Sequence, residues 1–154
     1  MRRTTVGDLL VPFLVLGATA YVLLKLSYGS IPPLQIYAPI PLAVLAFVEL
    51  LTARRVRAAV RHEPNARPIA AIVIARCVAL GKASALVAAG VAGVGAALLV
   101  RVIPDVSTVR AASNDLRVGI FLVVAALLLL AAGLLLERAG IDPSQGHRPP
   151  TGSA

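Results

Sequence analysis

The third of four stretches that lack a charged side chain reads ASALVAAGVAGVGAALLV over residues 83–100. The other three cover Leu9–Leu24, Ser27–Val48 and Val118–Leu136. Each stretch is close to the ~20 apolar residues with which a helix crosses the hydrocarbon core of a bilayer. We therefore predict an all-α membrane protein, built as an antiparallel four-helix transmembrane bundle.

Composition supports this reading, because 58% of the 154 residues are hydrophobic and only 14% are charged. We expect a single transmembrane domain over residues 1–141, with helices at about 8–28, 34–61, 69–103 and 115–138. The remaining residues, 142–154, are rich in Pro, Gly and Ser and are predicted to be disordered. The net charge is +8, and the basic residues lie next to the apolar segments, where they can contact anionic lipid headgroups. The lipid bilayer is therefore the expected partner, and nucleic acid is not.

Lys and Arg are distributed unevenly about the four stretches. Connections on the cytoplasmic side of a membrane protein carry an excess of these residues. The rule predicts a multi-pass protein of the cell (inner or plasma) membrane with both termini inside. The opposite side receives the Gly29–Pro33 turn and the Arg101–Arg117 connection, where Asp105 and Asp115 offset the arginines. We expect contacts with lipid headgroups from the basic connection, at Arg54, Arg55, Arg57 and Arg61.

The first stretch has an alternative interpretation. Two arginines near the N-terminus, an apolar run and the triplet Ala18-Thr19-Ala20 are also typical of a cleavable secretory signal. However, the apolar run continues past the triplet to Leu24, and Asp8 stands at its beginning. We favour a retained first helix; cleavage would leave three spans and an outside N-terminus.

The second stretch begins irregularly, with four prolines between Ile31 and Pro41. Proline removes an amide donor and clashes with the preceding turn, so a regular helix is expected only from about Pro41. We interpret the prolines as a lead-in on the outer surface, where tyrosines such as Tyr37 mark the interface. The alternative is a broken helix that lines a transporter cavity.

The third stretch belongs to a helix predicted from Ile69 to Ile103, longer than a bilayer is thick. Small residues at a spacing of four allow helix backbones to approach closely in lipid. We predict a close helix crossing at Gly93, and a lipid-facing position at Leu129 on the leucine-rich fourth helix. The two rows of small residues are Gly81, Ala85, Ala89, Gly93 and Ala97, and Ser84, Ala88, Ala92 and Ala96.

Charged residues recur near the inner ends of the predicted helices. They are the acids Asp8, Glu49 and Glu137 and the bases Arg76 and Lys82. Counted from a helix start near Pro41, Glu49 lies deepest, where a carboxylate needs a partner. We predict that it pairs with Lys82, or with Arg76 in second place. The alternative is that all these side chains extend to the headgroups.

Signatures of enzymes and metal sites are missing from the sequence. His62, His147 and Cys77 stand apart from one another and from any acid at ligand spacing. The segment Gly81–Ser84 lacks the residues that a phosphate-binding loop requires. We therefore expect a protein that is not an enzyme and that holds no cofactor and no metal.

Several segments resemble a known family. They are Arg54-Arg55-Val56-Arg57, the stretch Ala75–Leu86 with the glycines at 90 and 93, and the closing Leu136-Glu137-Arg138. Together they are similar to an uncharacterised four-span membrane family of actinobacteria, a domain of unknown function, and the resemblance covers nearly the whole chain. It implies an integral inner-membrane protein with four helices, often encoded near folate-synthesis genes, without an established activity. Gly81 departs from the family, which more often has alanine before the lysine.

These observations favour an accessory or scaffold subunit of a membrane complex, whose partner is another membrane protein or a second copy of the chain. The alternative is a small transporter or channel component with an intramembrane acidic residue, which Glu49 would provide.

Overall fold

A computed structural model of the protein describes residues 4–27, 35–61, 69–105 and 110–140. It contains α1 (Val6–Ser27), α2 (Ile40–Val60), α3 (Ala71–Val102), the short 3-10 helix η2 (Ile103–Asp105) and α4 (Arg110–Ala139). No strand occurs in these four segments, so the prediction of an all-helical protein is confirmed. The tail predicted over 142–154 lies outside the described residues.

Two helices begin at other places than the predicted bounds. Residues 36–39 form a turn, and α2 begins at Ile40 instead of 34, because Pro41 fits the first helical turn, where amide donors have no helical partner. In contrast, α4 begins at Arg110 instead of 115. Its extra turn is held by Ala112 and Leu116, which pack with Leu98 and Val102 near the end of α3.

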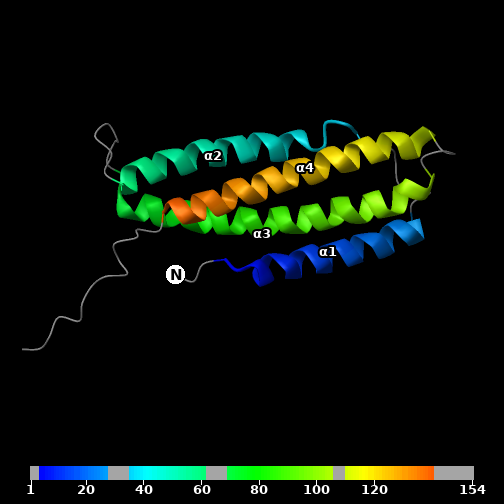
Figure 1. Cartoon of the computed structure of the whole chain (residues 1–154), viewed down its shortest axis with the longest axis horizontal. Coiled ribbons are helices and arrows are strands. Elements are labelled where there is room, and N and C mark those ends of the chain that lie inside the picture. The colour runs from blue at the N-terminus through cyan, green and yellow to red at the C-terminus, as the bar shows by residue number, and fades with distance from the viewer. Residues whose placement is uncertain (1–3, 28–34, 62–68, 106–109, 141–154) are drawn as a thin grey trace, which may run out of the picture.

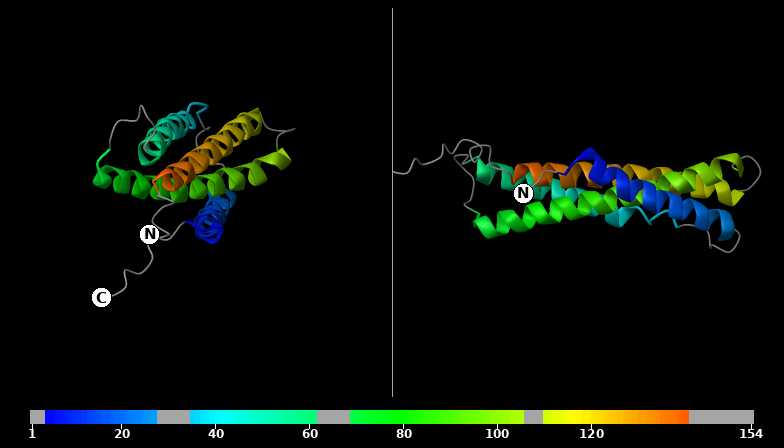
Figure 2. Two further views of the ribbon diagram at one scale, coloured as in Figure 1. Left: turned by 60° about the vertical axis from the view of Figure 1, so that its left-hand side comes forward. Right: turned by 90° about the horizontal axis from the view of Figure 1, so that it is seen from below.

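The helices lie side by side in the order α1, α3, α4, α2, and each runs opposite to the helix before it in the chain (Figures 1 and 2). The main contacts join α1 to α3, α3 to α4, and α4 to α2. Among the described helices, α1 packs against α3 alone, and none of its described side chains is fully buried. The arrangement is therefore a row of helices in which α3 and α4 form the centre.

Three of the helices are long and apolar enough to cross a membrane, namely α1, α3 and α4. With 32 residues, α3 is ~48 Å long at ~1.5 Å per residue, which exceeds the ~30 Å hydrocarbon core. In α2 the apolar part is shorter, because Glu49 lies within it and Arg54 and Arg55 follow. The helices thus have the character of a membrane protein.

The centre of the row is filled by small and aliphatic side chains. Leu129, which is only 2% exposed, packs with Ala46, Ala88 and Ala132 of three different helices. The expectation that Leu129 faces lipid is therefore wrong. Leucines occupy four consecutive positions from 127 to 130, and such a run covers every side of a helix. The exposed positions of the run are Leu127 and Leu128.

Candidate buried carboxyl site

Two glycines bring α3 and α4 into backbone contact. A Cβ atom built on Gly81 would lie 2.7 Å from the carbonyl oxygen of Gly133, and one built on Gly133 would lie 2.6 Å from the carbonyl oxygen of Gly81. Both distances are far below ordinary van der Waals contact. The two helices can approach this closely only because both positions lack a side chain.

Gly93 belongs to the same row of small residues as Gly81, and it brings α3 into contact with α1. A Cβ atom on Gly93 would collide with the carbonyl oxygen of Phe13, and one on Gly17 would lie 3.1 Å from the carbonyl oxygen of Gly93. A helix has ~3.6 residues per turn, so each step of four residues rotates the row by ~40°. Between Gly81 and Gly93 the row turns by ~120°. One row of small residues therefore serves two different neighbours.

Glu49 lies on α2 beside the contact of Gly81 with Gly133. Its side chain is only 1% exposed, and its Oε2 atom accepts a hydrogen bond from Ser84 Oγ at 3.0 Å. Its other oxygen, Oε1, is buried and has no hydrogen-bond partner among the described residues. A Cβ atom on Gly133 would lie 2.9 Å from Ser84 Oγ. Three helices thus enclose one carboxyl group and one hydroxyl group.

The position of Glu49 follows from the pattern of α2. Its buried residues are Ala46, Glu49, Ala53 and Val56, spaced three and four apart, so they form one face. Ala46 packs in a cluster with Ala88 and Leu129, and Ala53 in a second cluster with Leu136. Glu49 therefore lies between two apolar clusters.

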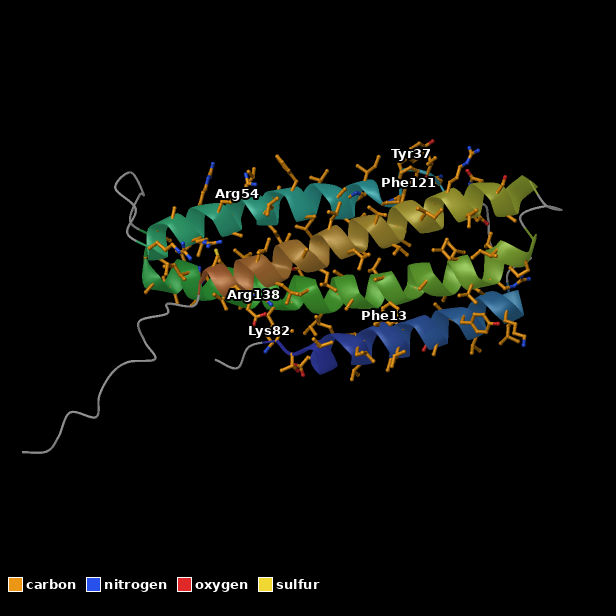
Figure 3. The ribbon with its side chains drawn as sticks, in the orientation of Figure 1. Phe13, Tyr37, Arg54, Lys82, Phe121 and Arg138 are labelled. Carbon is orange, nitrogen blue, oxygen red and sulfur yellow. The ribbon has the colours of Figure 1, made fainter. Side chains whose placement is uncertain are left out.

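The structure brings Glu49 to Ser84 and to neither of the expected bases. Positions two residues apart on a helix point in directions that differ by ~200°, so Lys82 and Ser84 cannot both face α2. Lys82 instead points toward the N-terminal end of α1, as Figure 3 shows. Arg76 is exposed, two turns farther from the site. The depth of Glu49 correctly indicated a buried acid, but it could not show which face of α3 lies opposite.

Asp8 and Glu137 have their own partners. The backbone N–H and the hydroxyl of Thr5 both donate to Asp8 Oδ2 at 2.9 Å, which caps the start of α1. The backbone N–H of Thr4 donates to Glu137 Oε1 at 2.8 Å and so joins the residues before α1 to the end of α4. Asp8, Glu49 and Glu137 therefore each have a hydrogen-bond partner of their own. Within the described segments no three His, Cys, Asp or Glu side chains form a group that could hold a metal ion.

The basic residues of α2 lie at the end of the molecule where α3 begins and α4 ends (Figures 1 and 3). The side chains of Arg54, Arg55, Arg57 and Arg61 are all exposed. Arg54 points away from α4. These four side chains are therefore accessible to molecules outside the protein.

Two apolar grooves mark the outside of the row. One, of about 470 Å³, lies between the start of α2 and α4 and includes Tyr37, Phe121 and Leu128. Tyr37 and Phe121 lie next to each other at the end of the row away from Arg54 (Figure 3). The other groove, of about 260 Å³, lies between α1 and α3, and small residues such as Gly17, Ala18 and Ala96 line it.

Ser84 has a different role from the predicted one: the sequence places it in a packing row, and in the structure its hydroxyl bonds Glu49. It is the only residue of the stretch 83–100 with a polar side chain. That signal marks Ser84 as a possible hydrogen-bond partner, although it does not name the acid.

The described residues form an all-helical structure in which three helices are long and apolar enough to cross a membrane, as is typical of membrane proteins. The chain belongs to the family described as Protein of unknown function (DUF3180), which matches residues 9–143. This agrees with the predicted resemblance to a family of unknown function. Searches of curated proteins and of solved structures each found no match.

Proposed function

We propose that the protein is a four-span subunit of the cell membrane, with both termini on the cytoplasmic side, that supports a larger membrane complex. The observation that carries the proposal is the groove between α1 and α3. Its small residues, among them Gly17, Ala18 and Ala96, remain accessible. Association of helices in lipid depends on close packing of small residues, so a groove of this kind suits a further transmembrane helix.

The exposed side chains of α2 support the proposal that this helix also crosses the membrane. Large apolar side chains are exposed from Ile40 to Leu51, and the exposed arginines begin at Arg54. An apolar face that ends in a basic one suits a helix that leaves the hydrocarbon core at the headgroups. Because α2 runs opposite to α3, this end is the one where α3 begins (Figure 1). The positive-inside rule then assigns this end to the cytoplasm.

Purification from native membranes in mild detergent tests the proposal. The wild-type protein is expected to elute with a stoichiometric partner or as a defined oligomer. Ala18→Leu fills the groove and should release that partner, because Ala18 lines it and is exposed. Ala131→Leu adds the same volume at an exposed position of α4 outside both grooves and should retain the partner. A wild-type monomer without a stoichiometric partner would contradict the proposal.

A second candidate function is a small transporter or channel component. It is favoured by Glu49, because a buried carboxyl oxygen without a hydrogen-bond partner is costly and is often retained for function. Flux into proteoliposomes that Glu49→Gln abolishes, measured for protein without a partner, would favour this candidate over the subunit.

A further inference from the structure

The hydroxyl of Ser84 has two acceptors and one hydrogen. Ser84 Oγ lies 3.0 Å from Glu49 Oε2 and 3.1 Å from the carbonyl oxygen of Gly81. A serine hydroxyl can donate only one hydrogen bond at a time, although it can accept others. A proton on Glu49 that is donated to Ser84 Oγ turns both short distances into full hydrogen bonds, whereas with a carboxylate the single hydroxyl hydrogen serves one acceptor or is shared between the two.

Within the described segments, the two apolar clusters beside Glu49 hold no charged side chain that would balance a carboxylate, and the titratable group packed against them is the Cys77 thiol of α3. The clusters on either side contribute Ala88 from α3 and Leu129, Ala132, Leu136 and Ala139 from α4, all uncharged.

The nearest charged positions on each helix have other environments. Lys82 of α3 points toward α1, Glu137 of α4 accepts the amide of Thr4, and Arg54 of α2 is exposed. A buried carboxylate with one hydroxyl donor and one unbonded oxygen is far costlier than the neutral acid.

We propose that Glu49 is a reversible proton-binding site and that Ser84 is the hydroxyl that reports its state. With the proton bound, the Glu49 O–H donates to Ser84 Oγ, and the Ser84 O–H donates to the carbonyl oxygen of Gly81. When the proton leaves for water, the Ser84 O–H turns and donates to Glu49 Oε2. This inference is independent of whether the protein serves as a subunit.

The exchange acts on the backbone contact that Gly81 and Gly133 make between α3 and α4. The carbonyl oxygen of Gly81 lies 2.6 Å from the position of a Cβ atom on Gly133. Rotation of the Ser84 hydroxyl adds or removes a hydrogen bond at that carbonyl. Protonation of Glu49 is therefore coupled to the packing of the two central helices.

A proton fits the site better than a metal ion does. Glu49 and Ser84 together offer three oxygen atoms, whereas a hard cation such as Ca²⁺ takes ~6–8 oxygen ligands. A proton needs one oxygen as its base and one acceptor, and Glu49 with Ser84 supplies both.

Infrared difference spectroscopy of the full chain in lipid nanodiscs tests the proposal. At neutral pH the wild type should show the carbonyl band of a neutral carboxylic acid, which weakens as the pH is raised. The band should vanish in Glu49→Gln and persist in Glu137→Gln, the matched control at a second buried acid. In Ser84→Ala the band should move to higher frequency, because the acid loses its hydrogen-bond acceptor.

Three results would overturn the proposal. The first is the lack of any neutral-acid band over the whole pH range in which the protein stays folded. The second is a band that is the same in Glu49→Gln as in the wild type. The third is a band that sodium or calcium removes at constant pH, which would assign the site to a metal cation. If Glu49→Gln does not fold, Ser84→Ala decides, and a band of unchanged frequency in that variant overturns the proposal.

Discussion

Replacing Gly133 by alanine tests the backbone contact between α3 and α4 directly. The added Cβ would lie 2.6 Å from the carbonyl oxygen of Gly81, 2.9 Å from Ser84 Oγ and 3.0 Å from the amide nitrogen of Ala85. Two of these atoms belong to the backbone of α3 and cannot move alone. Relief requires α3 and α4 to separate until the distance rises from 2.6 Å to the 3.4 Å of ordinary contact, a movement of about 0.8 Å.

The expected cost follows from two opposing terms. Overpacking a well-filled core costs ~1–3 kcal/mol, while alanine gains ~0.5–1 kcal/mol over glycine inside a helix. The free energy of unfolding should therefore fall by ~1–2 kcal/mol, which for a chain of this size lowers Tm by roughly 2–8 °C. The measurement is thermal unfolding of the purified protein in one detergent, followed by circular dichroism.

Gly7→Ala is the matched control, because the nearest atom to its added Cβ is Thr5 Oγ1 at 3.9 Å. This variant gains helix propensity without a collision, so its Tm should equal or exceed that of the wild type. A Tm for Gly133→Ala at or above the wild-type value would refute the reasoning, because the contact would then tolerate a methyl group.

The remaining predictions concern packing, topology and the carboxyl site. Gly93→Leu should separate α1 from α3 and lower Tm, whereas Leu127→Phe, at a position 52% exposed, should leave Tm nearly unchanged. Ile103→Cys in a cysteine-free background should react with an impermeant thiol reagent added outside intact cells, because its side chain is 60% exposed at the end opposite Arg54 and the other arginines of α2. A double-mutant cycle of Glu49→Leu and Ser84→Ala, read as unfolding free energy, should show a coupling of ~0.5–3 kcal/mol, because leucine cannot hydrogen-bond to Ser84.

Each of these has an outcome that would count against it. Equal Tm values for Gly93→Leu and Leu127→Phe would remove the close contact with α1. Labelling of Ile103→Cys only in inverted vesicles would reverse the topology. For the cycle, the control is Glu49→Leu with Lys82→Met, which should be additive because Lys82 faces away from α2. Coupling in this control and not with Ser84 would restore the ion pair that the sequence suggested.

For Glu49, the sequence predicts the burial of the side chain but not its hydrogen-bond partner. Counting residues from Pro41 places Glu49 at a buried depth, because rise per residue is nearly constant in a helix. The partner depends on which face of α3 lies opposite, and that is decided by the order of the helices in the row. Ser84 and Lys82 are close in depth and differ in direction, so the sequence alone could not choose between them.

For the rows of small residues too, the sequence predicts which positions make contacts but not which helix each position contacts. Their spacing located Gly81 and Gly93 at helix contacts, since only close approach requires such positions. The sequence did not show that the two glycines face different helices, because assigning neighbours requires the three-dimensional order. Leu129 was misplaced for a related reason, since a run of leucines carries no periodic signal that separates its inner face from its outer face.

The order of the helices in space also constrains how the chain is made. Among the described residues α1 and α2 do not touch each other; α1 is held by α3, and α2 chiefly by α4. The described parts of the half that leaves the ribosome first therefore share no helix–helix interface, so they can assemble only when the second half has been made. Until then Glu49 has no Ser84 beside it. A chain whose synthesis stops before α3 would therefore keep this acid without the hydroxyl that bonds it in the complete fold.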